Sequence, residues 1–168
     1  MKISKIFQKY LRKYTIEQDF SIIALPEYAM RTYKFDKPHI VISIKTPGAN
    51  KADIKPNFAC LDKLFLEFQD IDLAKCDKYI DCPELHPFNK KQAVEIIEFI
   101  NFHLENIEGL IVNCEAGVSR SPAIAAAIAL LLGQDNQIYF KKYLPNMYVY
   151  RTLIDTFFEE YGYIEPEG

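Results

Sequence analysis

A cysteine and an arginine lie six residues apart in the segment 113–122, Asn-Cys-Glu-Ala-Gly-Val-Ser-Arg-Ser-Pro. Cys114 is a nucleophile once it is ionised, and the planar guanidinium of Arg120 can bind two oxygens of one phosphoryl group. Gly117 permits a positive φ, which lets successive backbone N–H groups turn toward one bound anion. The spacing therefore predicts a loop that holds a phosphoryl group above the sulfur. The expected phosphate ligands are Glu115, Ala116, Gly117, Val118, Ser119 and Arg120.

The elements on either side of this segment direct it toward the start of a helix. Residues 110–112 are an apolar run typical of a buried strand, and the Ala-rich run 123–132 predicts a helix that ends at Gly133. We expect Ser121 to cap this helix, although its hydroxyl could instead point toward the sulfur of Cys114. Helix N-termini attract anions and favour a thiolate over a thiol. The alternative is that Cys114 is a buried, inert thiol at a strand end.

The pattern Cys114-x5-Arg120-Ser121 is similar to the signature of the cysteine-dependent protein tyrosine and dual-specificity phosphatases, and residues 115–122 resemble small dual-specificity-type members. The resemblance implies a phosphatase-like fold and hydrolysis of phosphomonoesters through a phosphocysteine intermediate, without a metal or cofactor. Cys114, Arg120 and Ser121 take the catalytic positions. The implied substrate is a protein or peptide carrying phosphotyrosine, with phosphoserine and phosphothreonine as further candidates.

Asn113 departs from this resemblance, because the family usually has a histidine there that braces the loop. One alternative is therefore a protein that binds phosphate without turning it over. Another is a phosphatase for a non-protein phosphate. Ala116 and Val118 stand where lipid-directed relatives have lysines, which argues against a lipid phosphate.

Hydrolysis of a phosphate ester also needs a general acid, because the leaving oxygen departs poorly as an anion. Four aspartates follow the predicted strand 64–68, and the carboxyl ends of parallel strands meet at one edge of a sheet. These are Asp70, Asp72, Asp77 and Asp81. Residues 64–72 resemble the acid-bearing loop of small bacterial-type members, which implies Asp70. The pattern alone does not separate Asp70 from Asp72, since both side chains of an extended segment point the same way.

Predicted strands and helices alternate along the chain. Strands are expected at 20–25, 39–45, 64–68 and 110–112, and helices at 26–33, 90–104, 123–132, 137–143 and 149–161. This order predicts an α/β fold with a parallel or mostly parallel sheet of about four strands flanked by helices. Residues 2–14 have helical amphipathic spacing, so 1–19 are expected to form an N-terminal helical extension of a single domain, 1–168.

Composition excludes several other classes of protein. A formal net charge of −3 over 168 residues gives no broad nucleic-acid footprint. No apolar run approaches the ~20 residues of a membrane span. The four cysteines have no zinc-type spacing, and His86 has no partner at metal spacing, so no metal site is predicted. His103 is expected at the surface rather than as a base. The cysteine pattern favours the reducing cytoplasm. The sequence leaves the oligomeric state open, and our expectation is a monomer. We also expect His39 at the surface.

Overall fold

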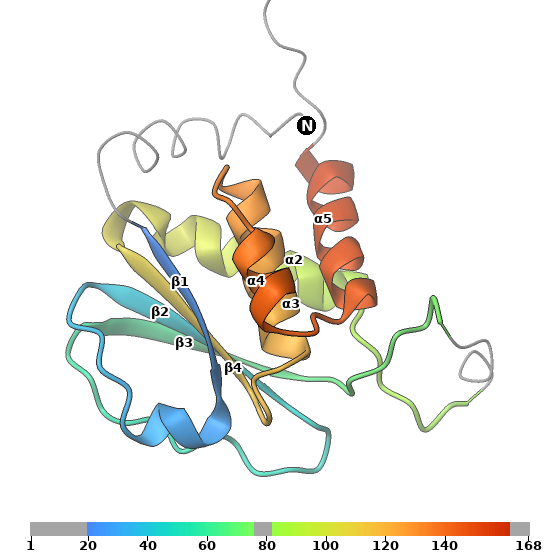
Figure 1. The fold of residues 1–168 in the computed structure, drawn as a ribbon, viewed down its shortest axis with the longest axis horizontal. Helices are drawn as coiled ribbons and strands as arrows, with labels where there is room; N and C mark the ends of the chain where they lie inside the picture. Colours follow the sequence, from blue (N-terminus) through green and yellow to red (C-terminus); the bar gives the residue numbers. More distant parts are fainter. Residues whose placement is uncertain (1–19, 76–81, 162–168) are drawn as a thin grey trace, which may run out of the picture.

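The computed structural model describes residues 20–75 and 82–161. The predicted helix over 2–14 and two of the candidate acids, Asp77 and Asp81, lie outside these residues. The described chain contains a four-stranded sheet of β1 (Ser21–Pro26), β2 (His39–Lys45), β3 (Cys60–Glu67) and β4 (Gly109–Cys114). The strand order is β1-β4-β2-β3, and all three pairings are parallel (Figure 1). The predicted α/β fold with a parallel sheet is confirmed.

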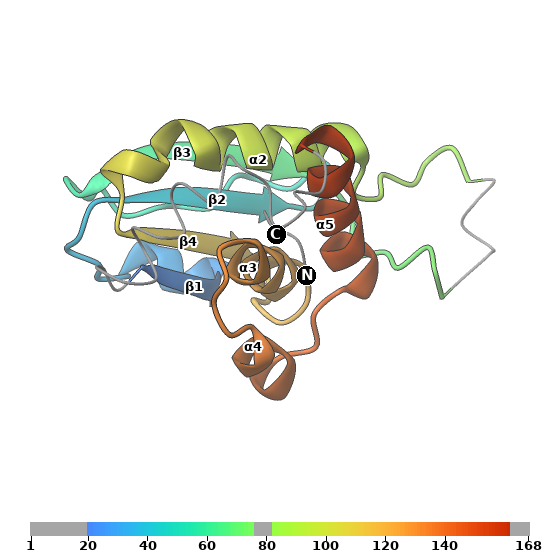
Figure 2. The ribbon, with the colours of Figure 1, turned by 90° about the horizontal axis from the view of Figure 1, so that it is seen from above.

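Helices cover one face of this sheet, as Figure 1 shows. They are α2 (Lys90–His103), α3 (Arg120–Leu131), α4 (Gln137–Lys142) and α5 (Met147–Tyr161). Seen from above in Figure 2, α2 lies on the β2 and β3 side and α3 on the β4 and β1 side. Isoleucines of β2, such as Ile42, and Val112 of β4 form a core with α2, α3 and α5. The burial of these apolar side chains is the main force that holds the helices on the sheet.

Local sequence signals set the ends of two helices. Asn89 and Gln92 form a capping box at the start of α2, in which each side chain accepts a hydrogen bond from the other residue's backbone N–H. At the end of α3, Gly133 has the positive φ of 75° that a residue just past a helix adopts. The body of α3 is buried almost all round, which its small alanine side chains permit.

The connection from β1 to β2 covers the opposite face of the sheet. The predicted helix over 26–33 is a shorter 3-10 helix, η1 (Glu27–Arg31), and a second one, η3 (Leu104–Asn106), follows α2. Met30 and Tyr33 from this connection pack on Val41 and Ile111. The strand predicted at 64–68 begins earlier, at Cys60. It is an edge strand whose first half is largely exposed, and it therefore lacks an apolar pattern there.

The prediction that His39 lies at the surface is wrong. Its side chain is fully buried between Tyr33 and Phe35, whose rings pack edge-on against it. Nδ1–H donates to the carbonyl of Lys37 at 2.8 Å, so Nε2 is free to accept from the Tyr33 hydroxyl at 2.9 Å. Burial lowers the pKa of His39 and raises the pKa of Tyr33 to about 12. Both side chains are therefore neutral parts of the core.

Candidate active site

Cys114 is the last residue of β4 and lies beneath the loop that leads into α3. Its side chain is buried, with 2% exposed. Three polar groups surround the sulfur: the backbone N–H of Gly117 at 3.3 Å, the backbone N–H of Ser121 at 3.4 Å and the Ser121 hydroxyl oxygen at 3.2 Å. All three groups can donate a hydrogen bond to the sulfur, which fixes its position at the start of the loop.

Ser121 is not the N-cap of α3, contrary to the prediction. The cap position belongs to Ser119, whose carbonyl accepts from the Ala123 N–H at 3.2 Å, and Ser121 lies in the first turn. Pro122 fits in that turn because helical N–H groups there need no partner within the helix. The other possibility, that the Ser121 hydroxyl points toward the sulfur, agrees with the geometry, since this fully buried hydroxyl faces Cys114.

The loop between Cys114 and Arg120 is held on two sides. Gly117 has a φ of 70°, and a Cβ at this position would lie 2.5 Å from the backbone nitrogen of Pro26 at the end of β1. On the other side, the Leu144 N–H donates to the Val118 carbonyl at 3.1 Å. Among residues 20–75 and 82–161, the backbone N–H groups of Ala116, Val118 and Ser119 have no acceptor. These groups are available to an anion at the N-terminus of α3.

Arg120 connects the carboxyl ends of three strands. Its Nη1 donates to the Phe68 carbonyl, beyond β3, at 2.7 Å and to the Thr46 hydroxyl, beyond β2, at 3.2 Å. Its Nη2 lies 3.7 Å from the carboxylate of Glu115, beyond β4. Arg120 is only 6% exposed, so these contacts fix the guanidinium in place.

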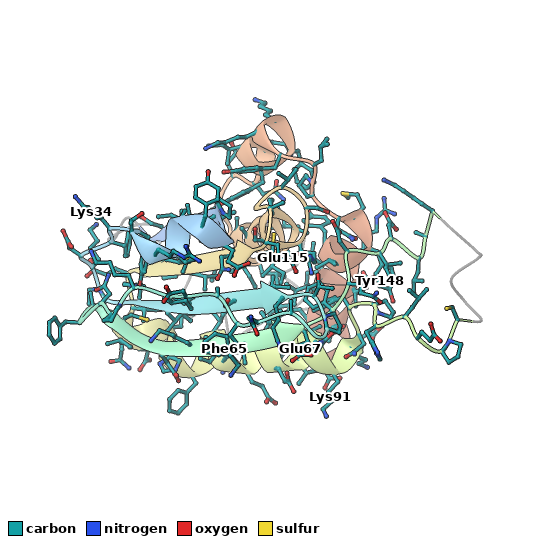
Figure 3. The ribbon with its side chains drawn as sticks, turned by 90° about the horizontal axis from the view of Figure 1, so that it is seen from below. Lys34, Phe65, Glu67, Lys91, Glu115 and Tyr148 are labelled. Atoms are coloured by element: carbon teal, nitrogen blue, oxygen red, sulfur yellow. The ribbon has the colours of Figure 1, made fainter. Side chains whose placement is uncertain are left out.

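The Glu115 carboxylate belongs to the same edge of the sheet, and Figure 3 shows it there together with Glu67. It accepts the backbone N–H of Thr46 at 2.9 Å. Hydrogen bonding from Thr46, with a smaller contribution from the positive charge of Arg120, lowers the pKa of Glu115. Thr46 is therefore a site residue that the sequence reasoning missed, because its two partners lie far away along the chain.

Of the two described candidate acids, only Asp70 reaches the loop. Its Oδ1 accepts the Ser119 hydroxyl at 2.8 Å and the Asn146 side-chain amide at 2.8 Å. The Asp72 carboxylate instead accepts the Ala74 N–H of its own turn at 3.1 Å. Asn146 was also missed by the sequence reasoning. Its single sequence signal is its position in a Pro-Asn turn directly before a helix.

Asn113 points away from this site, because successive side chains of a strand point to opposite faces. It is fully buried, and neither polar atom of its side chain has a hydrogen-bond partner within the described chain. Its neighbours in the sheet are Leu25 of β1 and Ser43 of β2. Asn113 therefore makes no side-chain hydrogen bond that would brace the loop.

Comparison with known proteins gives a match at the level of structure. No protein-family model matches the sequence, and no curated protein matches it. The solved structure of the human tyrosine phosphatase-like serine/threonine/tyrosine-interacting protein matches with a TM-score of 0.53 and 22% identity. The match covers 80% of this chain and 89% of that chain. This chain has a tyrosine phosphatase fold.

A second solved structure, Tk-PTP in the active form, is similar to this chain with a TM-score of 0.45 and 11% identity, over 81% of this chain and 89% of that chain. Within the described part of the fold, no helix has the length and apolar character needed to cross a bilayer. The same residues contain no cluster of three or more histidine, cysteine or acidic side chains that could hold a metal ion.

Proposed function

We propose that this protein is a cysteine-dependent phosphatase that hydrolyses phosphotyrosine, and also phosphoserine or phosphothreonine, in a protein or peptide. The observation that carries the proposal is the meeting of two groups at one loop. The sulfur of Cys114 lies among hydrogen-bond donors at the N-terminus of α3, and the Asp70 carboxylate is bonded to Ser119 of the same loop. A nucleophile and an acid on one anion-binding loop suit phosphoryl transfer.

In the proposed mechanism, the Cys114 thiolate attacks phosphorus, the S–P bond forms and the ester P–O bond breaks. The carboxyl group of Asp70 gives its proton to the departing oxygen. Backbone N–H groups of the loop and Arg120 stabilise the charge on the remaining phosphoryl oxygens. In the second step the Asp70 carboxylate takes a proton from water, the water oxygen bonds to phosphorus, and the S–P bond breaks to release phosphate and regenerate the thiolate.

Release of phosphate from a phosphotyrosine peptide, measured with EDTA present, tests this proposal. We expect turnover by the native protein, none by Cys114→Ser, and a loss of about 10²–10⁴-fold for Asp70→Ala. Cys60→Ser and Asp72→Ala are matched controls at a thiol and a carboxylate with no contact to the loop, and both should keep native rates. Native turnover that Cys114→Ser retains would refute the mechanism.

A binding protein without turnover is the second candidate. It is favoured by the contacts of Arg120, because Phe68, Thr46 and Glu115 occupy donors that a bound phosphate would use. Thermal unfolding in the presence of vanadate separates the two candidates. A raised melting temperature without hydrolysis of any phosphopeptide would support the binding protein, whereas hydrolysis would exclude it.

A further inference from the structure

Asn146 connects the acid, the phosphate loop and the last helix. It is 6% exposed and directly precedes α5. Its side-chain Nδ2 donates to Oδ1 of Asp70 at 2.8 Å and to the Ile71 carbonyl at 3.1 Å. Its backbone N–H donates to the Ser119 carbonyl at 3.1 Å, and its Oδ1 accepts the Val149 N–H at 3.1 Å.

These partners allow one orientation of the amide. The two side-chain N–H groups of Asn146 face oxygens of Asp70 and Ile71, and its oxygen faces the N–H of Val149. The reverse orientation would bring acceptors against acceptors and a donor against a donor. A buried amide that uses both donors and its acceptor in this way is rigid, and it can hold a neighbouring carboxylate in one place.

The two bonds to Asp70 also distinguish its oxygens. Oδ1 accepts from both Ser119 and Asn146, and within the described residues Oδ2 has no hydrogen-bond donor. An oxygen that accepts two hydrogen bonds is the carbonyl-type oxygen of a protonated carboxyl group. When the Asp70 carboxyl group is protonated, the proton therefore belongs on Oδ2.

We propose that Asn146 is a positioning residue for the general acid, which fixes the Asp70 carboxyl group against the phosphate loop and leaves Oδ2 as the oxygen that delivers the proton. This inference rests on the proposed phosphatase function. The side chain of Asn146 binds Asp70 and its backbone N–H binds the Ser119 carbonyl. One residue therefore fixes the position of the acid relative to the loop.

The dependence of kcat/KM on the leaving group tests the inference. Phenyl phosphate needs a proton on its leaving oxygen, whereas dinitrophenyl phosphate has a leaving group that departs readily as an anion. For Asn146→Ala and Asn146→Asp we expect kcat/KM on phenyl phosphate, which reports the step that forms the phosphocysteine, to fall about 10–10²-fold, part of the ~10²–10⁴-fold that a positioned acid supplies. On dinitrophenyl phosphate, kcat/KM should stay close to native, whereas kcat also includes the second step, in which Asp70 acts as the base.

Two variants separate positioning from folding. Asn146→Asp keeps an acceptor for the Val149 N–H, but it puts a carboxylate oxygen against Oδ1 of Asp70 and the Ile71 carbonyl. It should therefore lose the same activity as Asn146→Ala and be no more stable. Asn136→Ala is the matched control, because Asn136 is also a buried asparagine, with bonds to Ala126 and Tyr150 away from the site. It should lower stability without changing the ratio of the two rates.

A double variant tests whether Asn146 acts through Asp70. The double variant Asp70→Ala/Asn146→Ala should be no slower on phenyl phosphate than Asp70→Ala alone, because both changes remove the same proton transfer. An unchanged rate ratio in Asn146→Asp, or additive losses in the double variant, would overturn the inference but leave the phosphatase standing. Absence of turnover by the native protein on both substrates would overturn the proposed function and the role of Asn146 with it.

Discussion

Replacing Gly117 by alanine is the sharpest test of the loop geometry. Gly117 needs its lack of a side chain for two reasons, a φ of 70° and the closeness of β1. An added Cβ would lie 2.5 Å from the Pro26 nitrogen, 2.8 Å from its Cα and 2.9 Å from the Leu25 carbonyl carbon. These are all backbone atoms, which cannot rotate out of the way.

The expected size of the effect follows from a comparison with Gly48. Gly48 has a similar φ of 84° but no atom within 4 Å of an added Cβ, so Gly48→Ala has only the cost of the left-handed backbone. That cost is about 1–2 kcal/mol, partly offset by the narrower unfolded ensemble of alanine. Gly117→Ala adds an overpacking cost of about 1–3 kcal/mol, for a total loss near ~2–4 kcal/mol.

Thermal unfolding followed by circular dichroism measures this difference. We expect Gly48→Ala to lower the melting temperature by about 2–4 °C and Gly117→Ala by about 5–15 °C. The Gly117→Ala loop must also move away from β1, which should lower turnover of a phosphotyrosine peptide by about 10²-fold. Equal melting temperatures for the two variants would refute the close packing of the loop on β1.

Two further predictions concern buried polar side chains of the sheet, Asn113 in β4 and His39 in β2. Asn113→Leu replaces an amide without partners by an apolar side chain of similar size, and should raise the free energy of unfolding in urea by about 1–3 kcal/mol; a loss of stability would show that the amide is bonded. Burial lowers the pKa of His39, so below its ordinary value of 6.5 the unfolded chain binds a proton that the folded chain does not. The free energy of unfolding should therefore fall as the pH is lowered from about 7.5 to about 5.5. His39→Gln, which does not titrate, should weaken this dependence, and an identical pH dependence in the variant would contradict the buried neutral state.

The sequence was most informative where neighbours along the chain decide the structure. The segment 113–122 carries its own strand end, loop and helix start, so its residue types and spacing predict a strand, a loop and a helix in that order, although α3 begins earlier than expected, at Arg120. The capping box at Asn89 and the helix end at Gly133 are local in the same sense. The alternation of strands and helices was enough to predict a parallel α/β fold.

Features set by distant contacts were predicted less well. The N-cap of α3 lies at Ser119, whose carbonyl accepts from the backbone of Asn146 as well as from Ala123, and nothing near residue 121 indicates this. His39 is buried because Tyr33 and Phe35 fold back over it. The bond of Asn146 to Asp70 joins segments that are separated by one strand, β4, and three α-helices, α2, α3 and α4, beyond the reach of a local pattern.

The strand order has a consequence for how the protein is made. β4 lies between β1 and β2, so Ser21 pairs with Gly109, although β2 and β3 both leave the ribosome before β4 does. β2 and β3 can pair early, whereas β1 has no neighbouring strand to bind until residue 109 is available. Unpaired strand edges and contacts between distant residues slow folding and expose the chain to aggregation. We therefore expect insertion of β4 to be the late step, and the strand that completes the sheet is also the one that delivers Cys114.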